Sequence, residues 1–327
     1  MKKIRWGLLS TARINRQLIP IIRAAKRGLL VAVASRDQQT AQDYARQWEI
    51  PLAFGSYQAM LDSGNIDAVY IGLPNHLHAE WSIKALQAGL HVLCEKPFAI
   101  SLEEVDAMIA ASQENRRVLA EALMYRHHPQ TLIVKELLQS NKLGEINMVR
   151  GKFSFRLDAQ VDLRLEPEFG GGSLWDVGGY PVSFAQFVFG SAPEEVFGMQ
   201  EIGRTGVDVT FSGILRYANG KMAQIASSIL TPYHQAIEIT GHAGTLELNR
   251  PFNQINQVAR VFFTPNEGSA ERIRVPKREL YEGEVEDMHS AILDGTPTLV
   301  SLAETRNHVR TTLALFESAR TGKPVRL

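Results

Sequence analysis

The stretch His91-Val-Leu-Cys-Glu-Lys-Pro97 is an apolar run that ends abruptly in an acid, an amine and a proline. It predicts a buried strand that stops at Glu95, because proline cannot donate a hydrogen bond to a sheet ladder. Ligands of open α/β sheets bind outside the carboxyl ends of the strands, so Lys96 is expected at the mouth of a cleft. A strand capped by solvated charges is the alternative, and the neighbouring segments decide between the two.

Segments typical of strands and helices alternate on both sides of this stretch, as far as residue 122. Strands are expected at residues 4–9, 29–34, 52–54, 68–72, 91–95 and 118–122. Helices are expected between them, at residues 14–25, 40–48, 56–61, 79–88 and 101–113. The last of these opens with a capping box formed by Ser101 and Glu104. This alternation is typical of βαβ units, and right-handed crossovers then predict a doubly wound parallel sheet, an α/β fold.

The pattern changes after Gly144. Strands joined by short turns are expected at residues 146–156, 195–202, 207–217, 221–230, 237–240 and 245–248, with one helix at 173–189. The polar segment 253–278 is left unassigned, and helices at 282–293 and 302–320 could return to the first domain. We therefore predict a dinucleotide-binding domain over residues 1–123. The α+β domain over 124–327 would bind substrate and mediate oligomerisation, on a large, mostly antiparallel open sheet.

Composition narrows the classes of function. The 327 residues contain 35 Lys and Arg and 35 Asp and Glu, without a long run of one sign, which argues against a nucleic-acid partner. Cys94 is the only cysteine, and its apolar surroundings predict an inert buried thiol. The N-terminus has no apolar signal region and no stretch reaches membrane-spanning length, so a cytoplasmic protein without a membrane partner is expected.

Two strand ends suggest a nicotinamide dinucleotide. The first turn, Gly7-Leu-Leu-Ser10-Thr-Ala12, has the small residues that let a backbone approach a pyrophosphate, although an unrelated β-turn-α connection would also account for them. At the end of the second strand, Arg36 suits the 2′-phosphate of NADP, whereas the following Asp37 would suit the ribose of NAD. We predict NADP, with NAD and a merely solvated Arg36 as the alternatives.

Histidines stand close together at two places. In Gly72-Leu-Pro-Asn75-His-Leu-His78, the Pro-Asn turn is typical of a cofactor groove, and His78 is expected at a helix start facing the cleft. Neither this segment nor the pair His127 and His128 has a carboxylate or cysteine at ligand spacing. No metal site is therefore predicted.

A third motif reads Gly170-Gly-Gly172-Ser-Leu-Trp-Asp176-Val-Gly-Gly-Tyr180. Three glycines allow a loop to pass close to a ligand, and Asp176 and Tyr180 would share one face of the following helix. A phenol has a reference pKa of about 10, so it needs a nearby cation to act as a base near neutrality. Lys96 would provide that charge. The alternative is a helix that packs Tyr180 and Trp175 into a core and leaves Asp176 on the surface.

These motifs, in this order, resemble the glucose–fructose oxidoreductase / inositol dehydrogenase (Gfo/Idh/MocA) superfamily. Tyr180, with Arg164 shortly before the glycines, is similar to the branch of glucose–fructose oxidoreductase, dimeric dihydrodiol dehydrogenase and NADP-linked D-xylose dehydrogenase. Three residues depart from the pattern. Ser10 and Ala12 replace glycines, and Leu163 stands where tryptophan often precedes the arginine, which puts the local cofactor contacts in doubt.

The resemblance implies a Rossmann domain and an NADP(H)-dependent oxidoreductase acting on a sugar or related polyol. Hydride would pass between nicotinamide C4 and a hydroxyl or carbonyl carbon, with Tyr180 as acid/base, Lys96 lowering its pKa, and Asp176 binding a neighbouring hydroxyl. The implied cofactor site comprises Gly7, Ser10, Thr11, Ala12, Arg13, Ile14, Ser35, Arg36, Leu73, Pro74, Asn75, His78, Glu95, Lys96, Pro97, Arg164 and Tyr281. The implied substrate contacts are Lys96, Tyr125, Arg126, His127, Asp176 and Tyr180.

Three further expectations remain at this point. Arg126 equally suits an ion pair between domains. A homodimer or homotetramer is expected through the exposed face of the antiparallel sheet. The rival functions are an NAD-dependent, redox-assisted glycosidase of the same superfamily, against which Arg36 argues, and a non-catalytic NADP-sensing regulator.

Overall fold

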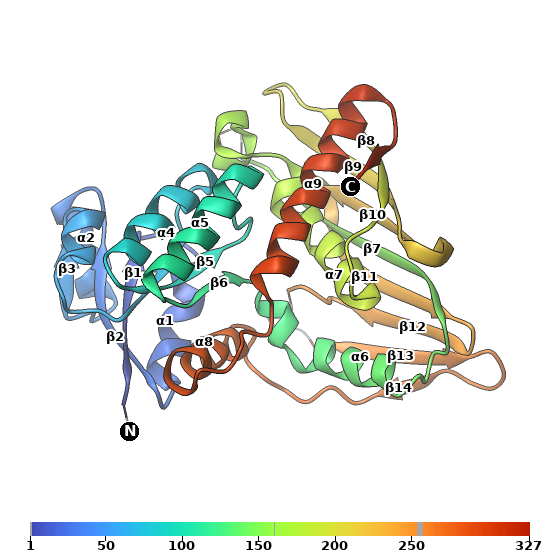
Figure 1. Ribbon diagram of the computed structural model, residues 1–327, viewed down its shortest axis with the longest axis horizontal. Helices are drawn as coiled ribbons and strands as arrows, with labels where there is room; N and C mark the ends of the chain where they lie inside the picture. The colour runs from blue at the N-terminus through green and yellow to red at the C-terminus, as the bar shows by residue number, and fades with distance from the viewer. Residues whose placement is uncertain (1, 160, 254–257) are drawn as a thin grey trace. The chain divides into compact units, whose positions relative to one another are not determined.

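The computed structural model describes residues 2–159, 161–253 and 258–327 (Figure 1). Within it the chain forms two compact units. The first comprises residues 1–127 and 281–305, and the second comprises residues 128–280 and 306–327. The helix near the C-terminus therefore contributes residues to both units.

The first unit contains a six-stranded parallel sheet in the order β3-β2-β1-β4-β5-β6. Its strands are β1 (Ile4–Leu9), β2 (Gly28–Ala34), β3 (Leu52–Phe54), β4 (Ala68–Ile71), β5 (His91–Glu95) and β6 (Leu119–Ala122). The order reverses between β1 and β4, which is the switch point where doubly wound sheets bind ligands. The predicted doubly wound sheet is confirmed, and its strands lie within a few residues of the expected positions.

Helices cover both faces of this sheet. They are α1 (Asn15–Ala24), α2 (Gln38–Gln47), α3 (Tyr57–Leu61), α4 (His78–Gln87), α5 (Leu102–Asn115) and α8 (Glu282–Asp294), with short turns η1 (Asn75–Leu77) and η2 (Met124–His127). The strand register places Trp6 and Tyr70 on one face, and the indole of Trp6 donates to His289 of α8 at 3.0 Å. Helix α8 therefore covers the face that carries Tyr70.

The second unit is built on a nine-stranded sheet in the order β14-β13-β12-β11-β7-β10-β9-β8-β15. All neighbouring strands are antiparallel except β7 and β10, so the predicted mostly antiparallel sheet is confirmed. The strands are β7 (Ile146–Arg156), β8 (Glu195–Ile202), β9 (Asp208–Arg216), β10 (Met222–Ser228), β11 (Leu230–Gly241), β12 (Gly244–Asn249), β13 (Arg260–Pro265), β14 (Glu271–Ile273) and β15 (Val325–Arg326).

Three parts of this unit differ from the expectation. Strand β11 begins at Leu230 rather than near 237. The sequence missed its first residues because they are exposed and lack the alternating pattern of a half-buried strand. Strands β13 and β14 lie in the unassigned polar segment, of which residues 254–257 fall outside the described chain. Helix α6 (Pro129–Gln139) was not expected; it begins with proline in its first turn and His128 as its cap.

Helices of the second unit pack against one face of its sheet. They are α6, α7 (Gly179–Phe189) and the later part of α9 (Leu302–Thr321), with short turns η3 (Leu163–Leu165), η4 (Pro167–Phe169), η5 (Leu174–Gly178) and η6 (Ala218–Gly220). A Cβ on Gly151 would lie 2.7 Å from Pro181 of α7, and one on Gly213 would lie 2.9 Å from Leu315 of α9. These glycines let the two helices approach the sheet closely.

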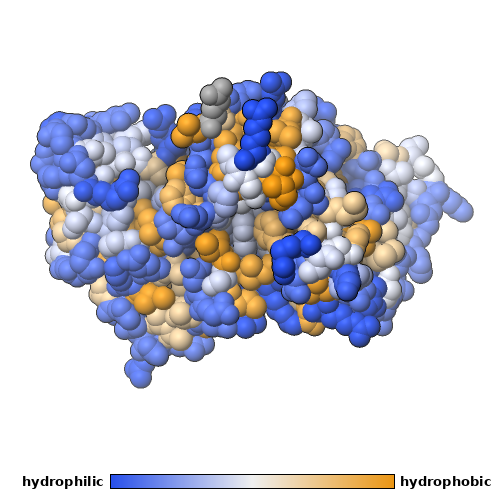
Figure 2. Space-filling model, turned by 90° about the horizontal axis from the view of Figure 1, so that it is seen from above, coloured by the Kyte–Doolittle hydropathy of each residue, from blue (hydrophilic) through white to orange (hydrophobic). Residues whose placement is uncertain are grey.

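In the described part of the chain, no helix combines the length and apolar character needed to cross a membrane. Hydrophilic and hydrophobic residues are interspersed on the face shown in Figure 2.

Candidate functional site

The turn between β1 and α1 is held by the side chain of Ser10. Its hydroxyl donates to the carbonyl of Gly72 at 2.9 Å and accepts from the amide of Ala12 at 3.2 Å. Ser10 adopts φ +134, a conformation that usually requires glycine, and Asn15 donates to its carbonyl at 2.8 Å. The amides of Asn15, Arg16 and Gln17 at the start of α1 donate to the carbonyls of Ala12, Arg13 and Ile14 at 3.1, 3.3 and 2.9 Å, and the positive end of the helix dipole can serve an anion.

At the end of β2, the side chains of Arg36 and Asp37 have different surroundings. Arg36 is exposed, whereas the carboxylate of Asp37 accepts from both the amide and the hydroxyl of Thr40 at 2.7 Å. These hydrogen bonds lower the pKa of Asp37 and cap α2, which therefore begins at residue 38 rather than 40. Because the acid is engaged by its own helix, the guanidinium of Arg36 is the group at this strand end that remains suited to a phosphate.

His78 corrects one expectation. The sequence predicted that its ring faces a cleft, but the side chain is fully buried at the start of α4. Its Nδ1 lies 2.7 Å from the carbonyl of Pro97 and its Nε2 lies 2.8 Å from that of Leu73. Burial lowers the pKa of the imidazole, and the nearby charge of Lys96 acts in the same direction. His78 thus ties the turn after β4 to the turn after β5, with Pro74 and Asn75 between them in the chain.

Glu95 supports the residue that follows it. Its carboxylate accepts from the hydroxyl of Tyr70 on the neighbouring strand and from the amide of Lys96, the latter at 3.2 Å. Burial raises the pKa of Glu95, while the hydrogen bond from Tyr70 and the charge of Lys96 oppose that rise. Its side chain is therefore engaged within the unit, and only its backbone is left for a ligand.

Two residues of α8 lie close enough to this carboxylate to feel its charge. Tyr281 is the N-cap of α8, and Glu284 follows in the first turn. Burial raises the pKa of both groups, and the charge of Glu95 raises each further. The carboxyl oxygens of Glu284 have no hydrogen-bond partner among the described residues. Glu284 is thus a buried carboxyl group near Glu95, and Tyr281 lies near the same carboxylate.

Tyr125, Arg126 and His127 occupy the short turn η2 after β6 and are buried. Arg126 pairs with Glu304, and His127 pairs with Asp287 at 3.1 Å; all four belong to the first unit. Arg126 and His127, which the sequence assigned to substrate, thus both have protein partners. The ion pair of Arg126 lies within the first unit, whereas the alternative interpretation expected a pair between domains. Thr305, which follows Glu304, donates to Glu121 at 3.0 Å.

In the second unit, two predicted site residues meet directly. The guanidinium of Arg164 donates to the carboxylate of Asp176 at 2.7 Å and to that of Asp162 at 3.1 Å. The negative charges of Asp176 and Asp162 raise the pKa of Arg164. Asp162 was not singled out by the sequence. The arginine is 46% exposed and Asp176 is 17% exposed, so the pair can offer donors and an acceptor to a ligand.

The glycine run packs against the backbone before it. The amide of Gly172 donates to the carbonyl of Arg164 at 2.9 Å, and that of Gly171 to Glu166 at 3.0 Å. The chain then enters a π-helical turn at Leu174, where the amide of Gly179 donates to Leu174. The predicted helix is therefore π-helical over residues 174–178 and α-helical only from 179, so the i, i+4 argument for Asp176 and Tyr180 does not strictly apply. Such turns are frequent at functional sites.

Tyr180 lies in an aromatic cluster. Its ring is 5.3 Å from that of Phe252 and 5.5 Å from that of Phe153, and the residue is only 5% exposed. The two phenylalanines fix the ring in a low-dielectric environment. The sequence did not single them out, because Phe153 on β7 and Phe252 in the segment after β12 have no feature that distinguishes them from ordinary core phenylalanines.

The remaining candidates are the single cysteine and groups of side chains that could bind a metal ion. The Cys94 thiol is buried, and burial raises its pKa. Among residues 2–159, 161–253 and 258–327, no three His, Cys, Asp or Glu side chains are arranged to hold a metal ion.

Family models match two segments of the chain. The model described as an oxidoreductase family with an NAD-binding Rossmann fold matches residues 4–123, and that of the GFO/IDH/MocA C-terminal domain matches residues 131–247. Among curated proteins, D-xylose 1-dehydrogenase (NADP(+)) 2 of Haloferax volcanii is 39% identical over 325 residues, covering 98% of this chain and 99% of that protein. Trans-1,2-dihydrobenzene-1,2-diol dehydrogenase of Xenopus laevis is 34% identical, over 75% and 74% of the two chains.

Solved structures show the same architecture. The aldose-aldose oxidoreductase from Caulobacter crescentus, complexed with glycerol, superimposes with a TM-score of 0.93 over 100% of both chains at 23% identity. A 3-ketoreductase from Actinomadura kijaniata, in complex with NADP and TDP-benzene, gives a TM-score of 0.90 at 28% identity, over 97% of this chain and 98% of that one.

Proposed function

The chain belongs to the GFO/IDH/MocA family of oxidoreductases, and on that premise we propose that it is an NADP(H)-dependent dehydrogenase or reductase of a sugar or related polyol. The observation that carries the proposal is the Arg164–Asp176 pair beside a π-helical turn and an enclosed Tyr180. A carboxylate, a guanidinium and a phenol together suit a substrate with several hydroxyl groups.

The residues at the strand ends of the first unit fit such a cofactor. The Ser10 turn and the positive end of the α1 dipole suit a pyrophosphate, and Arg36 offers a guanidinium to a 2′-phosphate. We assign the remaining contacts to the backbone of residues 73–75 and 95–97. When bound, the nicotinamide supplies hydride exchange at C4.

The chain's own residues then have separate roles in the proposal. Tyr180 exchanges a proton with the substrate hydroxyl, and Lys96 stabilises the phenolate and orients the substrate oxygen. Asp176, held by Arg164, accepts a hydrogen bond from a neighbouring hydroxyl. Tyr70 and Glu95 keep the backbone of Lys96 in place from within the sheet.

A substrate panel tests the proposal. Aldoses, dihydrodiols and keto-sugars are assayed with NADP(H) and NAD(H) by nicotinamide absorbance. Net turnover of added NADP with a free sugar or polyol is the expected result. Glycoside cleavage without net cofactor turnover would instead identify the redox-assisted glycosidase, and cofactor binding with no turnover across the panel would favour the NADP-sensing regulator.

Arg36→Ala is expected to raise the KM for NADP by about 10–100-fold while changing the KM for NAD less than threefold. The reason is that a charged hydrogen bond to phosphate contributes about 1.5–3 kcal/mol, and NAD has no 2′-phosphate. Steady-state kinetics with both cofactors measure the effect. Arg46→Ala, an exposed arginine of α2 that pairs with Asp43, is the matched control and should behave as wild type. Equal losses with NADP and NAD in Arg36→Ala would refute the assignment.

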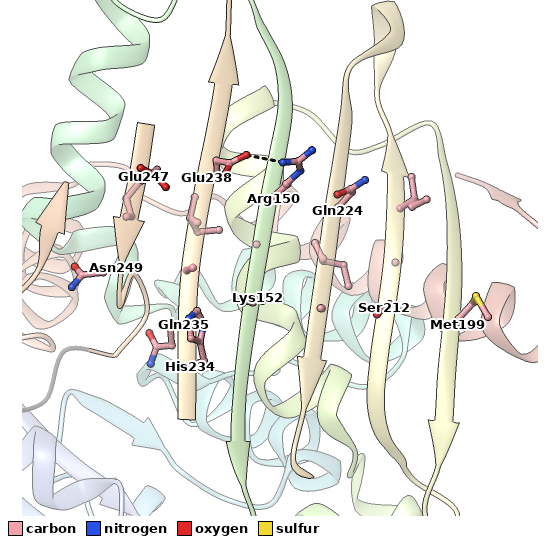
Figure 3. Close-up of a pocket in the computed structure, with 18 of the residues that line it drawn as sticks. Arg150, Lys152, Met199, Ser212, Gln224, His234, Gln235, Glu238, Glu247 and Asn249 are labelled. Carbon is pink, nitrogen blue, oxygen red and sulfur yellow. Dashed lines mark hydrogen bonds and ion pairs between the residues drawn. The ribbon is translucent and has the colours of Figure 1, made fainter. Parts of the chain in front are cut away.

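We also propose that the protein associates with a second copy of itself through the open face of the nine-stranded sheet. Figure 3 shows this face, a hollow of about 920 Å³ lined by side chains of successive strands. One row crosses the sheet from Ile214 through Gln224, Arg150 and Glu238 to Glu247. The row is apolar at the Ile214 end, and at its charged end Arg150 pairs with Glu238 of the neighbouring strand at 3.1 Å, so a two-fold axis near Ile214 would bring the apolar ends of two copies together.

Met199 and Ile214, which are 67% and 45% exposed, provide the apolar part of that face. Replacing both with glutamate is expected to give a 36.4 kDa monomer, because four carboxylates would be brought together in a self-complementary interface. Sedimentation velocity compares the variant with wild type. Leu29→Glu, at a 45% exposed leucine of the first unit, is the control that should keep the native mass. A monomeric wild type would refute the proposal.

The cytoplasmic location expected from the sequence remains a prediction.

A further inference from the structure

The segment that carries Asp176 and Tyr180 is anchored by an acid from a distant strand. Asp208, the first residue of β9, is only 3% exposed. Its Oδ2 accepts from the hydroxyl of Ser173 at 2.6 Å and from the amide of Leu174 at 2.9 Å. These two donors begin the π-helical turn, so the carboxylate meets the positive end of the helical segment.

The glycine run is shaped to accommodate this carboxylate. Gly172 adopts φ +109, and a Cβ placed on it would lie 2.1 Å from Oδ1 of Asp208. Oδ1 has no hydrogen-bond partner in the described part of the chain. The hydroxyl of Ser173 also lies 2.9 Å from that of Ser227 on β10.

An irregularity of the sheet turns Asp208 inward. Strict alternation along β9 would place it on the outer face with Thr210 and Ser212. The pairing of β8 with β9 shifts between Glu201 and Ile202, so one extra residue is accommodated on β9 and Asp208 faces the helical segment. A bulge that redirects one buried acid toward a predicted site is a feature that packing alone does not require.

We propose that Asp208 is a positioning residue: its ionised carboxylate holds the first turn of the segment that presents Asp176 and Tyr180. This role rests on the proposed function, since it matters only if those two residues act on substrate. Asp208 itself does not touch the reacting atoms. It acts through Ser173 and Leu174, whose placement sets the start of the helical segment.

Burial raises the pKa of Asp208 to about 6, and the hydrogen bonds from Ser173 and Leu174 oppose the rise. Hydroxyls and amides face it from η5 and β10. Charged residues also occur close to Asp208 and to the glycine run in the sequence. Arg164 pairs with Asp162 and Asp176, and Glu201 and Arg204 are exposed. Burial is the largest cause of the raised pKa of Asp208. His308 of α9 also packs against the segment, where a Cβ on Gly179 would lie 3.1 Å from its Nε2, so the comparison with Asp208→Asn is what assigns the transition.

Asp208→Asn separates positioning from folding. The amide keeps the shape and one acceptor, but a neutral acceptor forms weaker hydrogen bonds than a carboxylate, so kcat at pH 8 is expected to fall about tenfold. NADPH affinity should be unchanged. Because the folded chain holds the proton of Asp208 more tightly than the unfolded chain, ionisation destabilises the fold, and the neutral variant should have an equal or higher Tm above pH 6.

The pH dependence gives the decisive comparison. The ratio of wild-type to Asp208→Asn kcat should be about ten at pH 8 and approach one below pH 5.5, where wild-type Asp208 is protonated. A ratio that stays constant across this range would mean a purely structural role and would overturn the proposal. Thr210→Val is the matched control and should follow wild type. Thr210 lies two residues after Asp208 on β9, and the substitution removes its hydrogen bond with the hydroxyl of Ser228 on β10.

A second variant and a non-catalytic signal keep the test independent of activity. Ser173→Ala removes a hydrogen bond that lowers the pKa of Asp208, so the acidic limb should move to higher pH. Trp175, whose ring lies 5.7 Å from that of Phe316, reports on the segment by fluorescence, assigned by comparison with Trp175→Phe. Its emission should titrate near pH 6 in wild type but not in Asp208→Asn; no titration in wild type would overturn the proposal. If it titrates while Tyr180→Phe remains active, the acid/base role of Tyr180 fails and the anchor stands; if it titrates while no substrate of the panel is turned over, the proposed function fails and the anchor stands.

Discussion

Tyr180→Phe is expected to lower kcat by about 10²–10⁴-fold, the usual contribution of a positioned general acid or base. The substitution removes one hydroxyl and keeps the ring, so the packing against Phe252 and Phe153 is retained and the fold should be unaffected. NADPH binding, which we assign to the strand ends of the first unit, should stay within twofold of wild type. Steady-state kinetics and fluorescence titration with NADPH measure the two quantities.

Tyr233→Phe is the control for this variant. Tyr233 belongs to the same aromatic cluster, with its ring 5.9 Å from that of Phe153, but it is 44% exposed. Its loss should change kcat by less than threefold. If Tyr180→Phe keeps near wild-type turnover, the acid/base role is wrong, whatever the control does. If both variants lose activity equally, the effect belongs to the cluster and not to the hydroxyl of Tyr180.

The sequence predicted the strands of the first unit well because each is an apolar run bounded by turn residues. The strand 91–95 follows from its apolar run, and its end at Glu95 follows from Pro97. The boundary of α2 was missed by two residues, because Asp37 caps the helix through the amide of Thr40. Local patterns identify elements, but they do not say which of two roles a polar residue at a strand end takes.

The remaining differences arise from tertiary contacts. His78 is buried because carbonyls of two separate turns, Leu73 and Pro97, lie on either side of its ring. Arg126 and His127 look like ligands for substrate in the sequence, but partners 178 and 160 residues away engage them. Asp208 was not considered, because alternation along β9 would place it outside; only the shifted pairing with β8 brings it inward. Long-range pairing of this kind leaves no local signal.

Lys96→Met is expected to lower kcat/KM by at least about 10²–10³-fold, the effect of removing one electrostatic donor from a site that stabilises developing charge. Methionine keeps much of the side chain's length and volume, and the support of the backbone by Glu95 and Tyr70 remains. Because a phenol without a nearby cation ionises less readily, the pH at which oxidation reaches half its maximum should move upward. Kinetics of oxidation from pH 6 to 10 measure both effects.

The proposed cooperation of Lys96 with Tyr180 can be tested with the double variant. If the lysine acts by lowering the pKa of the phenol, Lys96→Met in the Tyr180→Phe background should cost much less than in wild type, since groups that act as a unit are strongly non-additive. Lys84→Met, which removes an exposed lysine paired with Glu80 on α4, should leave kcat/KM unchanged. Fully additive losses would show that the two residues serve separate steps, and an unshifted pH profile in Lys96→Met would remove the electrostatic role of the lysine.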